Sequence, residues 1–115
     1  MSRPGSGQRA EQRALRHYRL RCYRILATNA WVAGYELDLI VRRGRRLVFC
    51  EVKSKTGDGF GRPEEMVDRE KRRRLVRAAE AWLARHPECR GLEMSFEVVA
   101  VHGAALGRIP LGDPW

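Results

Sequence analysis

The sequence lacks an apolar run long enough to cross a membrane, since none approaches the ~20 consecutive residues that a spanning helix needs. The first seven residues are rich in Gly, Pro and Ser and lack the apolar core of a secretory signal, so we expect residues 1–7 to form a disordered lead-in. Cysteine is scarce, and the three that occur form neither a CxxC pair nor a zinc-binding spacing. An odd number of cysteines without a signal peptide predicts reduced thiols and a cytoplasmic protein.

Histidine is also scarce and scattered. The three histidines show no HExxH motif and no paired spacing, so we expect them to be surface or packing residues rather than metal ligands. The Gly-rich stretch at 56–62 lacks the ending of a P-loop, and no Ser-His-Asp or Cys-His pattern is present. These absences argue against zinc, phosphate-loop and nucleophile-based sites.

Positive charge is abundant. Lys and Arg number 23 against 14 Asp and Glu, which gives a net charge of +9 and a pI near 10.5. Such an excess predicts nucleic acid as the partner, with an anionic membrane surface less favoured. The alternative is an arginine-rich composition inherited from a GC-rich genome, with solvated arginine faces. The length of 115 residues and the 43% of hydrophobic residues predict one domain, residues 8–115, around one modest core.

Hydrophobic periodicity predicts an α/β domain in which a mixed central sheet is flanked by helices. The expected elements are a helix over 8–22, strands over 23–28, 36–42 and 45–54, a helix over 63–86, a strand over 94–101 and an edge strand near Ile109. The first helix has an apolar stripe that includes Tyr18 and Cys22, a basic outer face, and Glu11 near its buried edge. Residues 29–34 are expected to form a turn, where Trp31 could stack on a base or, as we favour, pack on the sheet.

Charged residues interrupt the two most apolar strands. Asp38 lies in the strand that contains Leu37 and Leu39, and Glu51 and Lys53 lie in the strand that returns from a tight turn. Charges in such strands are costly unless they pair or bind something. Alternation places Leu37 and Leu39 on one face, opposite Asp38, and it places Glu51 and Lys53 together on one face. The pairing register decides whether Asp38 and Glu51 meet, and the sequence leaves it open.

These residue types suit phosphodiester hydrolysis. Two carboxylates from adjacent strands, Asp38 and Glu51, can hold one Mg²⁺ or Mn²⁺, which neutralises phosphate charge and activates water. Lys53 can orient that water or stabilise the developing charge. Glu11, from the first helix, could complete the site as a third carboxylate. The structural alternative is that Glu51 and Lys53 form an ordinary ion pair on an exposed strand, since E-x-K alone is a common tripeptide.

The ordered set of motifs is more specific than any single part. Its two longest runs are GYELDLIVRRGRRLVFCEVKSK and FGRPEEMVDREKRRRL. Over residues 11–101 the chain resembles the YraN family of small bacterial proteins, which are similar to archaeal Holliday junction resolvases. The resemblance implies the restriction-endonuclease-like fold of the PD-(D/E)xK superfamily.

Position by position, Asp38 resembles the motif aspartate, and Glu51 with Lys53 resembles the (D/E)xK pair. Glu11 resembles the glutamate on the N-terminal helix of resolvase-like members. Lys71 matches a lysine often present at the next helix, which contacts phosphate or only extends the basic face. The departures are Ala10 and Cys22 in place of glycine, Cys50 in place of valine and Glu97 in place of aspartate. None of them removes a candidate ligand.

The sequence therefore supports two main hypotheses. The first is a metal-dependent endonuclease acting on DNA, with branched DNA favoured through the resemblance to resolvases, and with a homodimer plausible for the same reason. The second is a non-catalytic nucleic-acid-binding module on the same fold. A third is a scaffold whose basic face binds an acidic protein. The residues expected to contact phosphates are Lys55, Arg69, Lys71, Arg72 and Arg73.

Overall fold

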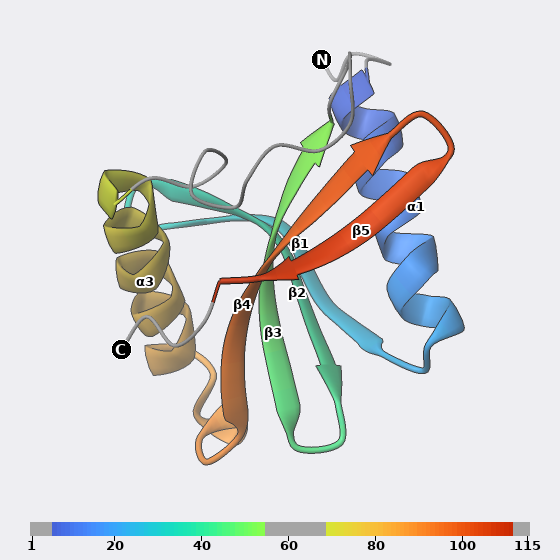
Figure 1. Cartoon of the computed structure of the whole chain (residues 1–115). Helices are drawn as coiled ribbons and strands as arrows, with labels where there is room; N and C mark the ends of the chain where they lie inside the picture. Colours follow the sequence, from blue (N-terminus) through green and yellow to red (C-terminus); the bar gives the residue numbers. More distant parts are fainter. Residues whose placement is uncertain (1–5, 55–68, 112–115) are drawn as a thin grey trace.

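The computed structural model describes residues 6–54 and 69–111 of the chain (Figure 1). The elements in order are α1 (Ser6–Leu20), β1 (Arg24–Val32), β2 (Tyr35–Arg43), β3 (Arg46–Ser54), α3 (Arg69–Ala84), the 3-10 turn η1 (Pro87–Cys89), β4 (Glu93–His102) and β5 (Ala105–Pro110). The five strands form one sheet in the order β1-β2-β3-β4-β5. The predicted single α/β domain with an edge strand near Ile109 is confirmed. The predicted loop at 56–62 and the expected helix start at 63–68 lie outside the described residues.

The sheet is mixed because one connection crosses over. β3 and β4 are parallel, and all other neighbouring strands are antiparallel. Parallel strands need a long connection, and here it contains α3. Figure 1 shows α3 against one face of the sheet and α1 against the other. In the described part of the chain neither helix is long and apolar enough to cross a bilayer.

Two apolar clusters fill the space between the helices and the sheet. The α3-facing core includes Leu37, Ile40, Leu47, Phe49, Leu75, Ala78, Ala79, Trp82 and Phe96. The α1-facing core includes Ala10, Ala14, Tyr18, Tyr23, Leu39, Val41, Val48, Cys50, Val99 and Val101. Trp82 meets Phe49 edge-on, with 5.9 Å between ring centroids, as aromatic pairs prefer. Burial of each such side chain contributes about 1.5–3 kcal/mol.

The first helix differs from its predicted bounds at both ends. It begins at Ser6, two residues before the expected start and within the expected lead-in, whereas residues 1–5 lie outside the described part. It ends at Leu20, so Cys22 is not on the buried stripe as predicted: it is exposed, with a φ of 67°. This left-handed residue redirects the chain into β1 and places Tyr23 in the core instead.

The first strand is longer than predicted. It extends to Val32, so the expected turn at 29–34 contracts to Ala33 and Gly34. Asn29 remains in the sheet with a φ of 50°, and such a left-handed residue breaks the regular alternation of side chains. Trp31 consequently lies in a strand and is 69% exposed, so the packing that we favoured from the sequence is wrong.

The same irregularity affects β2. Leu37 packs in the α3-facing core, but Leu39 packs in the α1-facing core. The sequence predicted that the Leu37 and Leu39 side chains share one face of the sheet, and this prediction is wrong. On the partner strand β1, Ala27 and Ala30 both contact the α3-facing core, so the two strands change face together. Asp38 lies at this change of face.

The turn between β1 and β2 carries local strain that a substitution can relieve. Its two central residues, Ala33 and Gly34, have φ values of 54° and 77°. Positive φ at both positions characterises type I′ hairpin turns, in which asparagine is preferred over alanine at the first position. We expect Ala33→Asn to raise the free energy of unfolding by about 0.5–1 kcal/mol, measured by urea denaturation, because the cost of a left-handed alanine is about 1 kcal/mol. An unchanged or lower midpoint would contradict this account of the turn.

A buried polar network ties α1 to the centre of the sheet. Arg108 on β5 donates to both carboxylate oxygens of Glu97 on β4, over 2.8 and 3.0 Å, and the Tyr18 hydroxyl donates to Glu97 over 2.7 Å. These partners lower the pKa of Glu97 against the effect of burial. The Cys50 thiol donates to the Tyr18 hydroxyl over 3.2 Å. The network thereby holds β3 immediately before Glu51.

Candidate functional site

The central feature of the site is a point where two paired strands separate. β2 and β3 pair from Arg43↔Arg46 as far as Leu39↔Cys50, and pairing ends there although both strands continue. Beyond it β2 stays with β1 while β3 stays with β4, and the two strands diverge in Figure 1. Asp38 and Glu51 are the next residues on each strand. We call Asp38, Glu51 and Lys53 the strand fork.

Where β2 and β3 separate, one backbone N–H group of β3 has no strand partner, and Asp38 accepts its hydrogen bond. The amide of Val52 donates to Asp38 Oδ2 over 2.9 Å, in the gap where a strand ladder would otherwise continue. A buried amide without a partner is costly, so the carboxylate stabilises the open end of the pair. The register of β2 on β3, which the sequence left open, places Asp38 next to β3.

Asp38 is held in an unfavourable environment for a charge. Burial and then the negative charge of Glu51 raise its pKa to about 7, against the opposing effect of the hydrogen bond from Val52. Glu11 and Glu36 raise it further. A carboxylate with a raised pKa among other carboxylates binds a proton or a cation favourably.

Glu51 is nearly fully buried and is held from two sides. Its side chain accepts a hydrogen bond from the Tyr35 hydroxyl over 2.8 Å, and Lys71 Nζ lies 3.6 Å from its other oxygen. Tyr35 comes from the start of β2 and Lys71 from the first turn of α3. Burial and the charge of Glu51 raise the pKa of Tyr35, which keeps this hydroxyl protonated as a donor. Tyr35 was not predicted as a site residue, although it lies directly before the acidic residues Glu36 and Asp38 in the sequence.

Lys53 belongs to the same electrostatic group. Its contact with Lys71 and its partial burial lower the pKa of Lys53, while Glu51 and Asp38 oppose that shift. A lysine with a lowered pKa loses and regains a proton more readily than a solvated one. The structure thus brings together Asp38, Glu51 and Lys53, and it adds Lys71 to them.

Glu11 approaches from α1 but is held by another residue. The Asn29 side-chain amide donates to both oxygens of Glu11, over 3.2 and 3.3 Å. Glu11, Asn29 and Asp38 line one small cavity of about 60 Å³, with Val52 at its wall. This role of Asn29 was not predicted from the sequence. Its backbone is left-handed, with a φ of 50°.

The donor set fits a hard divalent ion only in part. Within the ranges 6–54 and 69–111, no three His, Cys, Asp or Glu side chains lie close enough to form a metal site together. In this structure Glu11 is held by Asn29 while Glu51 faces Tyr35 and Lys71, so the three carboxylates do not lie together, and their joint role as ligands stays a prediction. Asp38 and Glu51 remain a suitable pair, since Mg²⁺ commonly takes one or two carboxylates and keeps several waters.

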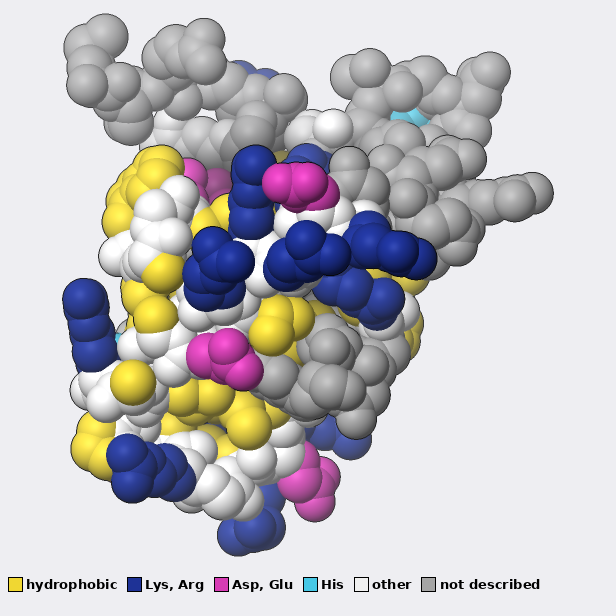
Figure 2. Space-filling view, turned by 90° about the vertical axis from the view of Figure 1, so that its left-hand side faces the viewer, with side chains coloured by type: hydrophobic (Ala, Val, Ile, Leu, Met, Phe, Trp, Pro, Cys, Tyr) yellow, Lys and Arg dark blue, Asp and Glu magenta, His cyan; other side chains and the backbone are white. Residues whose placement is uncertain are grey.

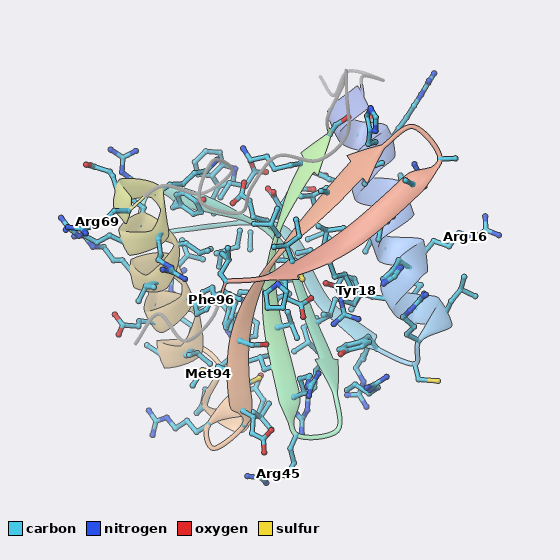
Figure 3. The ribbon with its side chains drawn as sticks, in the orientation of Figure 1. Arg16, Tyr18, Arg45, Arg69, Met94 and Phe96 are labelled. Atoms are coloured by element: carbon cyan, nitrogen blue, oxygen red, sulfur yellow. The ribbon has the colours of Figure 1, made fainter. Side chains whose placement is uncertain are left out.

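The residues predicted to bind phosphates divide between two places. Arg69, Arg72 and Arg73 line a shallow cavity of about 350 Å³ along the outer side of α3. Figure 2 shows Lys and Arg side chains gathered over this part of the surface, and Figure 3 shows Arg69 pointing away from the sheet. Lys71 instead turns to Glu51. Lys55 lies outside the described residues.

A second basic surface lies on the other helix. Arg16 and Arg19 are exposed on α1, and with Arg13 they border an open cavity of about 520 Å³. Figure 3 shows Arg16 projecting away from the sheet, on the side of the molecule opposite Arg69. Both helices therefore present arginines outward, as the sequence predicted for α1.

Comparison with known proteins decides the family. The model of the uncharacterised protein family UPF0102 matches residues 10–101, which include Glu11 and the whole strand fork. This chain belongs to UPF0102, the YraN family.

The UPF0102 protein of Methylorubrum extorquens is 44% identical over 97 residues, which cover 84% of this chain and 74% of that protein. The UPF0102 protein of Halorhodospira halophila is 43% identical over 97 residues, or 84% of this chain and 77% of its own length. That of Parvibaculum lavamentivorans is 41% identical over 109 residues, or 95% and 80%.

Membership of UPF0102 confirms the family that the sequence motifs indicated. The matched region runs from α1 through β4, so it contains the elements that build the site and leaves out β5.

Proposed function

We propose that this UPF0102 protein is a cytoplasmic, divalent-metal-dependent endonuclease that acts on DNA. The observation that carries the proposal is the strand fork, which places two carboxylates and a lysine of lowered pKa at the one point where β2 and β3 separate. The structural alternative was an ion pair between Glu51 and Lys53, but Glu51 pairs with Lys71 instead. Two carboxylates and a lysine on two neighbouring strands suit hydrolysis of a phosphodiester.

Each residue of the site has a distinct role in this proposal. A bound Mg²⁺ or Mn²⁺, held by Asp38 and Glu51, would supply phosphate neutralisation and water activation. Lys53 orients the attacking water and exchanges a proton with it, for which its lowered pKa is suited. Tyr35 fixes the orientation of Glu51, and Lys71 offsets charge on the phosphate. Glu11, held by Asn29, is the candidate third carboxylate.

The arginines on α3 supply affinity in the same proposal. Each phosphate that they neutralise releases counterions, so binding should weaken steeply as salt rises. Arg69, Arg72 and Arg73 lie on the outer side of the helix whose inner side carries Lys71, so a bound sugar-phosphate backbone would run along α3. A second copy of the chain is a further candidate partner, in keeping with the dimeric resolvases that the family resembles.

A non-catalytic DNA-binding module is the second candidate. One observation favours it: the described residues do not assemble three metal-ligating side chains at the fork. On this alternative the arginine surfaces bind nucleic acid, and the acidic group stabilises the open ends of β2 and β3.

The two candidates separate in one experiment. The purified protein is incubated with labelled single-stranded, duplex and four-way-junction DNA in Mg²⁺, Mn²⁺ or EDTA. The endonuclease proposal expects salt-sensitive binding in all three solutions and strand scission only with metal. Binding without scission under every condition would favour the non-catalytic module. Absence of any DNA binding at moderate salt would overturn both.

A further inference from the structure

An exposed tryptophan stands beside the strand fork. Trp31 is 69% exposed, although it lies inside β1 rather than in a loop. Its neighbours Ala30 and Val32 pack in or against the α3-facing core, so the Trp31 side chain projects from the opposite face of the sheet. The strand therefore fixes the position of an indole that contributes little to the core.

This indole lies on the side of the sheet that α1 covers. Glu11 and Asp38 line a small cavity on that side, whereas Glu51 is held by Lys71 on the α3 side. Trp31 pairs directly with Glu36 on β2, and Glu36 precedes Asp38 by two residues on that strand. On β1, Asn29, the partner of Glu11, is two residues away, or about 7 Å along the strand. Trp31 thus forms part of the rim of the site.

The surrounding charges restrict what the indole can bind. Glu36, Asp38 and Glu11 lie on its side of the site, and they would repel a phosphate placed over Trp31. A nucleobase is flat and uncharged, and it stacks favourably on an aromatic ring.

Resting on the proposed function, we propose that Trp31 is a stacking platform for an unpaired base of the DNA substrate. A base inside a duplex is covered on both faces by its neighbours and cannot reach this indole. The site therefore takes DNA that contains unpaired nucleotides, such as a single strand, a flap or the branch point of a junction.

The test is binding in EDTA, where no cleavage interferes. Trp31→Ala, Trp31→Phe and the wild type are compared on a labelled single-stranded oligonucleotide and on a blunt duplex of the same sequence, by fluorescence anisotropy. Leu20→Ala is the control for the loss of an exposed apolar side chain, because Leu20 is 70% exposed at the end of α1, beside the arginines of that helix. Since Trp31 is exposed, its replacement should leave the fold intact, and the melting temperature checks this.

We expect Trp31→Ala to weaken single-strand binding roughly 5- to 150-fold, the equivalent of one base–aromatic stack. Duplex binding should change less than twofold, Trp31→Phe should retain most of the affinity, and Leu20→Ala should resemble the wild type. Equal losses on both substrates, or none, would overturn the inference. So would a Trp31→Ala protein with unchanged DNA binding but an altered sedimentation coefficient, which would identify a protein contact instead.

The failure of this inference is distinguishable from the failure of the proposed function. If the wild type cuts DNA with metal and Trp31→Ala binds single strands equally well, only the stacking role is overturned. If the wild type binds neither oligonucleotide, the stacking role and the proposed function are overturned together.

Discussion

Replacement of Lys53 by alanine is expected to abolish metal-dependent strand scission while leaving the fold and DNA binding intact. Lys53 is the cation of the strand fork whose pKa is lowered, and it lies among Lys71, Glu51 and Asp38. General acid–base groups contribute about 10²- to 10⁴-fold to reaction rates, so we expect the rate to fall by at least about 100-fold. Lys53 is partly solvated, so its loss costs little stability. The measurement is the single-turnover cleavage rate of junction or single-stranded DNA in Mg²⁺.

The control for this prediction removes the same charge from another surface. Arg16→Ala also loses one positive charge, but Arg16 is exposed on α1, on the side of the molecule opposite Arg69. We expect it to weaken binding slightly and to leave the cleavage rate at saturating protein unchanged. Equal cleavage by Lys53→Ala and the wild type would exclude Lys53 from the chemistry. Equal losses in both variants would show that only net charge matters.

Replacement of Asp38 by asparagine is expected to stabilise the metal-free protein. Burial and the nearby carboxylates disfavour the charge at this position, and asparagine removes it while its side-chain oxygen can still accept the hydrogen bond from Val52. We expect the free energy of unfolding to rise by about 2 kcal/mol at pH 8, less than the whole pKa shift would give because Asp38 is partly solvated. Chemical denaturation at several pH values measures it.

The stabilisation by Asp38→Asn is expected to depend on pH. The pKa of Asp38 is about 7 in the folded protein and about 4 in an unfolded chain, so between these values only the folded state holds the proton. The wild type therefore loses stability as pH rises from about 4 to 7, and the deficit is complete above that window. The advantage of Asp38→Asn should be absent near pH 4 and full at pH 8. A constant difference across this range would contradict the assigned cause.

Metal binding completes the same experiment. Millimolar Mg²⁺ or Mn²⁺ should raise the melting temperature of the wild type, because a ligand of the folded state alone stabilises it. Asp38→Asn should show little or no such rise. Glu36→Gln is the matched control, since it makes the same kind of change two residues away and should retain the metal response. No shift of the wild type with either metal would count against a metal site at the strand fork.

Local sequence pattern determined much of this molecule. The helical spacing of Ala14, Leu15 and Tyr18 predicted the buried stripe of α1, because a face of period 3.6 must be covered. The alternating and apolar runs predicted the strands, and the motif residues from Glu11 to Lys53 indicated the family that the comparison confirmed. These features depend on residues close together in the sequence, so they can be predicted without knowledge of the tertiary structure.

What the sequence left open depends on contacts between distant segments. The register of β2 on β3, and the point where their pairing stops, follow from the packing of both helices on a twisted sheet. Lys71 turns to Glu51, and Glu11 pairs with Asn29, because α3 and α1 approach the fork from opposite faces. Trp31 is exposed because Asn29 breaks the alternation of β1. The sequence alone thus predicted the candidate residues, and only the tertiary structure decided which of them meet, since pairing and packing energies depend on positions far apart in the chain.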